Sequence, residues 1–140
     1  MSKLVAQLKR HEGVKSHAYK CTANMITVGV GRNIDEHGGI GLSDDEINYL
    51  LENDIKRCKQ ELIALSWFTD LDSVRQDALV NLCFNLGLTR LMGFKNAMAA
   101  MAEGDYERAA DEFYDSRWAK QVKSRADEVC EMIRTGRYPE

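Results

Sequence analysis

The stretch HEGVKSHAYKCTANMITVGVGRN, residues 11–33, differs in character from the rest of the chain and decides the fold. It is rich in Gly, Asn, Thr and Val, and β-branched residues alternate with glycine in its second half. Residues 22–24, Thr-Ala-Asn, have the composition of a turn. We therefore predict a small β-hairpin or three-stranded sheet within residues 14–41, followed by a glycine-rich loop.

Periodic apolar positions on both sides of this stretch predict helices. Residues 2–11 have one apolar face. Ser43 and Glu46 form a capping box, which predicts a long helix ending near Leu62. The remaining helices are expected at Asp72 to Gly87, 94–102, 106–114, 117–122 and from Ser124 to Gly136, with Asp72 and Ser124 as N-caps.

The order of helix, small sheet and many helices predicts an α+β protein with a small β lobe and a larger, mostly helical lobe. The 140 residues fit a single domain. We assign residues 13–42 to the β lobe, and residues 1–12 and 43–140 to the helical lobe. A ligand is expected in a cleft between the lobes.

Composition excludes several classes of function. The net charge of −3 argues against a nucleic-acid partner. The N-terminal region lacks the apolar run of a signal peptide, and no stretch approaches a membrane span. We expect synthesis in the cytoplasm without membrane insertion.

The four cysteines form no C-x-x-C pair, and no Cys/His cluster has zinc spacing. No metal or other cofactor is therefore expected. Cys58, Cys83 and Cys130 lie on apolar helical stripes and are predicted to be small, reduced core residues.

Eight residues separate Glu12 from Cys21, and five separate Cys21 from Thr27. This spacing resembles the catalytic pattern of the phage-type lysozymes, glycoside hydrolase family 24, in which Glu is followed by Asp or Cys and then by Thr. The chain departs from the best-known member by a shorter loop at 32–42 and by Cys at the second position, which some members share. The resemblance covers essentially the whole chain and extends to Ala18-Tyr19-Lys20, Thr27-Val28-Gly29-Val30-Gly31, Gly93-Phe94, Ser116-Arg117-Trp118 and Arg134-Thr135-Gly136.

The resemblance implies a lysozyme-like fold and an endolysin: a muramidase that hydrolyses the β-1,4 bond between N-acetylmuramic acid and N-acetylglucosamine in peptidoglycan. Its partners would be the glycan strands of the cell wall, and a separate holin-like protein would release it to them. A monomer is the simplest expectation for this size. Two alternatives remain: a catalytically weak or inactive peptidoglycan-binding module, suggested by the missing acid at position 21, and an unrelated helical interaction domain.

Glycoside cleavage needs a proton donor for the leaving oxygen, and the resemblance assigns this role to Glu12. Partial burial at the end of a helix would raise the pKa of this carboxyl group. The resemblance also places Arg125 beside Glu12, which would lower that pKa, and the balance stays open. Thr27 is expected to help to place the attacking water.

Cys21 stands where a carboxylate is common, and an unperturbed thiol is mostly neutral at pH 7. Three roles are open: a thiolate nucleophile with retention of configuration, a group that orients water with inversion, or a near-spectator. We favour the water-orienting role.

Further residues are expected to support the site. Asp54 lies on an apolar stripe and needs a partner, so we predict an ion pair with Arg32. Asn81 and Asn85 lie one turn apart on the central helix and are expected either to bind sugar amides or to face solvent. Trp118 is expected in the core rather than as a sugar platform.

Overall fold

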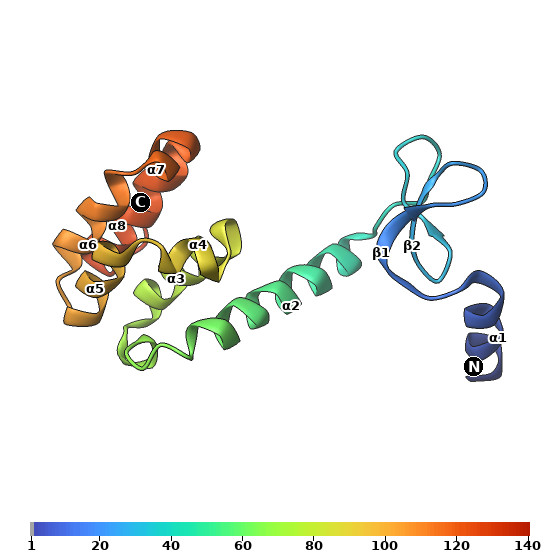
Figure 1. Cartoon of the computed structure of the whole chain (residues 1–140), viewed down its shortest axis with the longest axis horizontal. Coiled ribbons are helices and arrows are strands. Elements are labelled where there is room, and N and C mark those ends of the chain that lie inside the picture. Colours follow the sequence, from blue (N-terminus) through green and yellow to red (C-terminus); the bar gives the residue numbers. More distant parts are fainter. Residues whose placement is uncertain (1) are drawn as a thin grey trace. The chain divides into compact units, whose positions relative to one another are not determined.

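The computed structural model describes residues 2–140 and has the predicted α+β class (Figure 1). One three-stranded sheet and eight α-helices occur in this part of the chain. The elements are α1 (Ser2–Glu12), β1 (Lys15–Lys20), β2 (Ile26–Gly29), β3 (Arg32–Asn33), α2 (Asp44–Leu62), the 3-10 helix η1 (Phe68–Asp70), α3 (Ser73–Leu86), α4 (Leu88–Met92), α5 (Lys95–Glu103), α6 (Tyr106–Tyr114), α7 (Arg117–Val122) and α8 (Ser124–Thr135).

The chain divides into two compact units after Leu50. We call the part up to Leu50 the sheet unit and Leu51–Glu140 the helical unit. Helix α2 begins in the first and ends in the second. Each unit is described by itself, and the single domain expected from the sequence stays a prediction.

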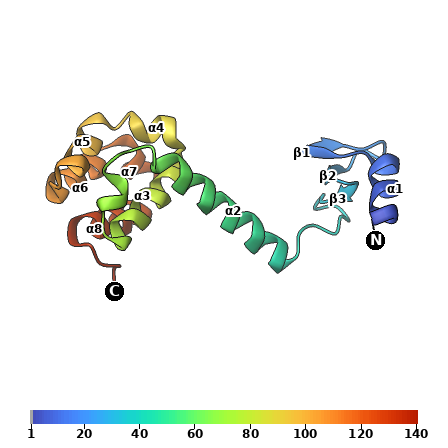
Figure 2. The same cartoon turned by 90° about the horizontal axis from the view of Figure 1, so that it is seen from below.

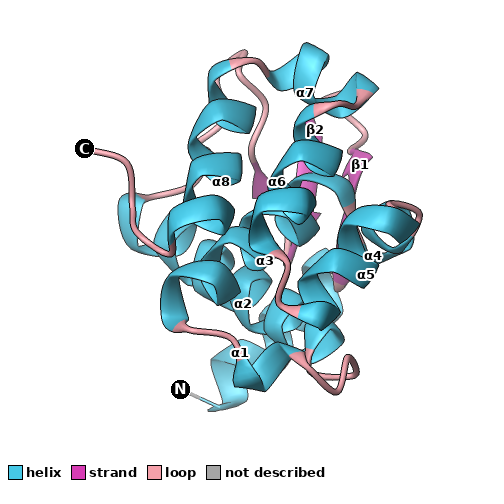
Figure 3. Ribbon diagram, turned by 90° about the vertical axis from the view of Figure 1, so that its left-hand side faces the viewer, coloured by secondary structure: helices cyan, strands magenta, loops and turns pink. Residues whose placement is uncertain are grey.

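The sheet is antiparallel in the order β1-β2-β3, with its short strands drawn in magenta in Figure 3. Thr27 on the central strand pairs with Tyr19 on one side and Asn33 on the other. Asn24 has a φ of 64° in the turn after β1, a conformation that Asn tolerates better than most residues. The three-stranded form of the predicted sheet is confirmed.

Asp35 organises the loop that follows the sheet. Its carboxylate accepts the backbone N–H groups of Ile26 and His37, each at 2.9 Å, and its residue is only 8% exposed. The hydrogen bond from Ile26, and next that from His37, lower the pKa of this carboxyl group. Asp35 therefore fastens the loop to the start of β2.

The capping box at the start of α2 is confirmed. The backbone N–H of Ser43 donates to Glu46 Oε1 at 2.9 Å, and the backbone N–H of Glu46 donates to Ser43 Oγ at 3.4 Å. Along the predicted apolar stripe of α2, only Cys58 and Leu62 are buried.

The core of the helical unit surrounds α3, as the apolar pattern predicts. Ala78, Leu79 and Leu82 are fully buried. Asp72 caps this helix by accepting the backbone N–H of Arg75, and Gly87 ends it with a φ of 81°. Helix α8 packs against α3 and α6, and α6 packs against α5, so the helices gather into one bundle (Figure 2).

Two details of the helical unit differ from the predictions. Helix α4 was not expected, because five residues are too few to show a helical period. Ser124 is not the N-cap of α8 but its first residue; Lys123 holds the cap position with a φ of 54° and no capping side-chain bond. The tight junction with α7 places the serine one residue inside the helix.

Arg75 joins three helices of this unit. Its Nε donates to the carbonyl oxygen of Ile133 at 2.6 Å, and its Nη2 to that of Arg134 at 3.1 Å. Its guanidinium carbon lies 3.8 Å from the ring centroid of Tyr106. The side chain thus satisfies carbonyl groups in the last turn of α8 while it stacks on α6.

We expect Arg75→Lys to lower the free energy of unfolding by about 2 kcal/mol, because an ammonium group cannot bind both carbonyls and stack on the ring. Urea unfolding followed by circular dichroism measures this change. Arg108→Lys is the control, since Arg108 makes an exposed ion pair with Glu103, and its effect should stay within about 0.5 kcal/mol. Equal effects of the two substitutions would contradict the role given to Arg75.

Candidate active site

All three predicted catalytic residues lie in the sheet unit. Glu12 is the last residue of α1, Cys21 follows β1 directly, and Thr27 lies in the middle of β2. The local fold explains their places: Gly13, with a φ of 80°, ends α1 and donates its N–H to Lys9 O at 3.0 Å, so the chain turns into β1 just after Glu12.

The side chain of Glu12 is exposed within the sheet unit and lies against the backbone of Gly31. A Cβ atom placed on Gly31 would be 2.6 Å from Glu12 Oε2 and 3.0 Å from Glu12 Cδ. The end of α1 and the turn between β2 and β3 therefore meet at this carboxyl group. The burial expected for Glu12 is not supplied by this unit.

Thr27 is 3% exposed, and its hydroxyl donates to the carbonyl oxygen of Met25 at 3.0 Å. The same hydroxyl lies near the Cys21 thiol and contributes to lowering its pKa. Because a hydroxyl hydrogen rotates about the C–O bond, Thr27 serves either acceptor. The structure therefore brings Cys21 and Thr27 close to one another.

Cys21 opens the turn between β1 and β2. Its backbone N–H donates to Met25 O at 3.0 Å and its carbonyl accepts from Asn24 N–H at 2.8 Å. The thiol is half-buried, and hydrogen bonding from the backbone of Met25, then of Ala23, lowers its pKa against the opposing effect of burial. The turn therefore makes the thiolate form of Cys21 more accessible than that of an unperturbed cysteine.

In place of the predicted ion pair, Arg32 and Asp54 each have another partner within their own unit. Arg32 binds Glu46 with two parallel hydrogen bonds of 2.8 and 2.7 Å, and its Nη1 also donates to Gly41 O at 2.9 Å. Asp54 pairs with Arg57, one turn along the same helix, at 2.6 Å. The short loop after β3 brings the first turn of α2, rather than its middle, to Arg32, and the capping box already marked Glu46 as the acid in that turn.

The supporting residues of the helical unit have partners of their own. Arg125 Nε donates to Asn81 Oδ1 at 3.0 Å, and these two residues line a cavity of about 450 Å³ together with Leu51 and Phe84. Asn85 Oδ1 accepts from Trp118 Nε1 at 2.7 Å. Trp118 is 3% exposed, which confirms its place in the core. The expected proximity of Arg125 to Glu12 stays a prediction.

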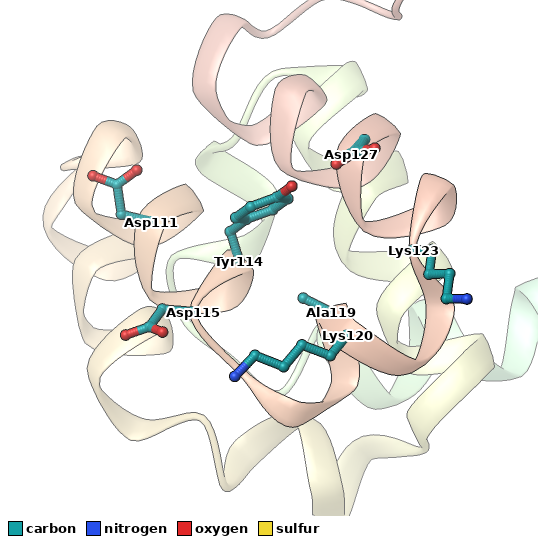
Figure 4. Close-up of a pocket in the computed structure, with 7 residues that line it drawn as sticks. All are labelled: Asp111, Tyr114, Asp115, Ala119, Lys120, Lys123 and Asp127. Carbon is teal, nitrogen blue, oxygen red and sulfur yellow. The ribbon is translucent and has the colours of Figure 1, made fainter.

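A second cavity of the helical unit, of about 500 Å³, contains none of the predicted site residues (Figure 4). Figure 4 shows Tyr114 beside Asp127, with Lys120 and Lys123 at the rim. Cavity size alone therefore does not locate the site.

The thiols at 58, 83 and 130 are free and buried, as predicted. Within residues 2–140, no group of three or more His, Cys, Asp or Glu side chains is arranged to hold a metal ion. None of the helices in this range is both long and apolar enough to cross a membrane.

A small antiparallel sheet with a Glu at the end of the preceding helix, followed by a helical bundle, defines a lysozyme-like fold. The family model described as phage lysozyme matches residues 9–135, and the chain belongs to this family. It is accordingly a lysozyme-type glycoside hydrolase, and its substrate class is the peptidoglycan of the cell wall.

Known proteins agree at low identity. The chain is 26% identical to the probable T4-type lysozyme 2 of Dictyostelium discoideum, over all of this chain and 98% of that protein. It is 27% identical to the pre-baseplate central spike protein Gp5 of Enterobacteria phage T4, over 95% of this chain and 28% of that protein. It is 28% identical to an endolysin of Acyrthosiphon pisum secondary endosymbiont phage 1, over 81% of this chain and 75% of that protein.

We expect iodoacetamide at pH 7 to alkylate Cys21 roughly tenfold faster than any other cysteine, because the thiolate is the reactive form. Burial raises the pKa of the Cys83 thiol to about 12 and that of Cys130 to about 11. Mass spectrometry of the modified peptides gives the four rates. Native Cys21→Ala protein should stay unlabelled over the same period; labelling of a buried cysteine first would contradict the assignment.

We expect Glu46→Gln to lower the melting temperature at pH 7, since the amide loses the charged pair with Arg32. Hydrogen bonding to Arg32, then to Ser43, lowers the pKa of Glu46 from 4.5 to about 2. The stabilisation is therefore complete above pH 4.5 and is lost as the pH falls towards 2. In thermal melts, the difference in melting temperature between wild type and Glu46→Gln should shrink as the pH falls from 4.5 towards 2.

Asp45→Asn is the matched control, because Asp45 shares the first turn of α2. Its effect on the melting temperature should be smaller. A difference between wild type and Glu46→Gln that is constant from pH 7 to pH 2 would contradict the role of the ion pair.

Proposed function

We propose that the protein is an endolysin-type muramidase of glycoside hydrolase family 24, in its Glu/Cys/Thr form, that hydrolyses the β-1,4 bond between N-acetylmuramic acid and N-acetylglucosamine. The observation that carries this proposal is the gathering of the spaced motif in one small unit. The side chain of Glu12 contacts Gly31 in the turn after β2. The hydroxyl of Thr27, on β2, lies near the thiol of Cys21.

Glu12 is the proton donor in this proposal. It lies at the end of a helix, and the turn at Gly31 contacts its side chain from one side. It gives its proton to the glycosidic oxygen as the bond to the anomeric carbon breaks. Positive charge then develops on the sugar ring.

Cys21 and Thr27 act on water. A thiolate stabilised by backbone hydrogen bonds accepts a proton from the water that attacks the anomeric carbon, and Thr27 orients that water through its hydroxyl oxygen. The lowered pKa of the thiol supports this role over that of a spectator. Attack by water in a single step gives a product with inverted configuration.

The residues of the helical unit contribute binding. Because Arg125 occupies the amide oxygen of Asn81, and Trp118 that of Asn85, both asparagines have their NH₂ groups left for other partners. Such donors suit the acetamido carbonyl and hydroxyl oxygens of a sugar. Arg32 supports the sheet unit through Glu46, and Asp54 is assigned no contact with substrate.

The proposal includes the setting of the reaction. The enzyme acts as a monomer on glycan strands, needs no cofactor, and reaches the wall from the cytoplasm after a separate holin-like protein has opened the membrane. The alternative, a peptidoglycan-binding module without turnover, is supported by the missing carboxylate at position 21; the thiolate-favouring turn argues against it.

Turbidity loss of outer-membrane-permeabilised cells tests the proposal. We expect Glu12→Gln to lower the rate by about 100-fold or more, because the amide donates no proton to the leaving group. Glu36→Gln is the control, since Glu36 is an exposed acid of the same unit that pairs only with His37. A binding module would sediment with peptidoglycan and leave its glycan chains intact.

The anomeric form of the first product, followed by NMR, tests the role of Cys21. Inversion is expected; retention would show that the thiolate is the nucleophile. We expect Cys21→Asp to keep activity and Cys21→Ala to lose roughly tenfold or more. Full activity in both variants would remove Cys21 from the mechanism.

A further inference from the structure

The turn between β2 and β3 consists of Val30 and Gly31, and the three atoms nearest to the Cβ position of Gly31 all belong to Glu12. A Cβ on Gly31 would lie 2.6 Å from Oε2, 3.0 Å from Cδ and 3.1 Å from Cβ of Glu12. Carbon atoms do not approach a carboxylate so closely without displacement. The bare backbone of Gly31 is therefore the surface on which the Glu12 side chain lies.

We infer that Gly31 is a positioning residue for the general acid: the absence of its side chain determines where the Glu12 carboxyl group stands. The inference rests on the proposed role of Glu12 and adds a residue outside the Glu/Cys/Thr motif.

Backbone conformation alone does not account for this glycine. Gly31 has a φ of 63°, yet Asn24 at 64° and Lys123 at 54° adopt the same sign of φ with full side chains. Gly29, the last residue of β2, has a φ of 71° and nothing within 4 Å of its Cβ position. Both glycines adopt a positive φ, but only Gly31 lacks the space for a Cβ atom.

The turn cannot easily withdraw from Glu12. The residue after Gly31 is Arg32, which pairs with Val28 in the sheet and holds Glu46 and the carbonyl of Gly41 through its guanidinium group. A side chain added at Gly31 therefore meets a backbone fixed on both sides. The flexible end of Glu12 moves instead, so the close contact adds little to the loss of stability that the positive φ itself causes, while the acid leaves its place.

We expect Gly31→Ala to lower kcat by about 100-fold with little change in KM, because a displacement near 1 Å is enough to misplace a catalytic group. Gly29→Ala carries the same strain at positive φ without the close approach, and its kcat should stay within about twofold of wild type. Melting temperatures of the two variants should fall by similar amounts. Soluble peptidoglycan fragments provide the kinetic assay.

A double-mutant cycle with Glu12→Asp separates positioning from a general defect. Glu12→Asp withdraws the carboxyl group by one methylene and relieves the contact with an alanine at 31. The double variant should be no slower than Glu12→Asp alone. Additive losses, or equal kcat values for Gly31→Ala and Gly29→Ala, would overturn the inference. An active Glu12→Gln enzyme would instead overturn the proposed function, whatever the glycine variants do.

Discussion

Two parallel hydrogen bonds between Arg32 and Glu46 connect the sheet to the start of α2, two parts of the sheet unit that are 14 residues apart in the chain. They link β3 to the first turn of α2, and the hydrogen bond from Arg32 to Gly41 O adds the intervening loop. Taken by itself, this unit buries no hydrophobic side chain among residues 2–50. Its two buried residues, Thr27 and Asp35, are polar. Polar geometry therefore specifies the sheet unit, whereas close packing specifies the helical unit.

A unit whose structure is specified by hydrogen bonds is suited to the proposed catalytic role. Hydrogen bonds are directional, so a unit built on them fixes side chains within narrow limits even without a large core. Asp35 fastens the start of β2, which carries Thr27, and Arg32 fastens the turn on which Glu12 lies. The same dependence on ionised carboxylates makes the unit sensitive to acid, since both Asp35 and Glu46 have lowered pKa values. The hydrogen bonds to ionised carboxylates thus both fix the side-chain positions and make the unit sensitive to acid.

The parts of the structure that depend on local sequence could be predicted, and the parts that depend on distance in space could not. The capping box at Ser43, the cap at Asp72 and the glycine end of α3 are local signals, and each is confirmed. The partner of Arg32 depends on the path of a loop, and an apolar stripe pointed to Asp54 instead of Glu46. The contact between Glu12 and Gly31 joins two segments 19 residues apart. The sequence does not show which side chain will pack against a glycine in a turn.

Cysteine at a position that usually holds a carboxylate follows the same logic, because the environment gives the residue its chemistry. The four thiols of this chain are the same group in two kinds of surroundings. In the core, burial raises the pKa of Cys83 to about 12 and makes it a small apolar side chain. In the turn after β1, backbone hydrogen bonds from Met25 and Ala23 favour the anion at Cys21. A turn that stabilises negative charge narrows the difference in pKa between a thiol and a carboxylic acid, and in the proposed mechanism the hairpin supplies this stabilisation to Cys21.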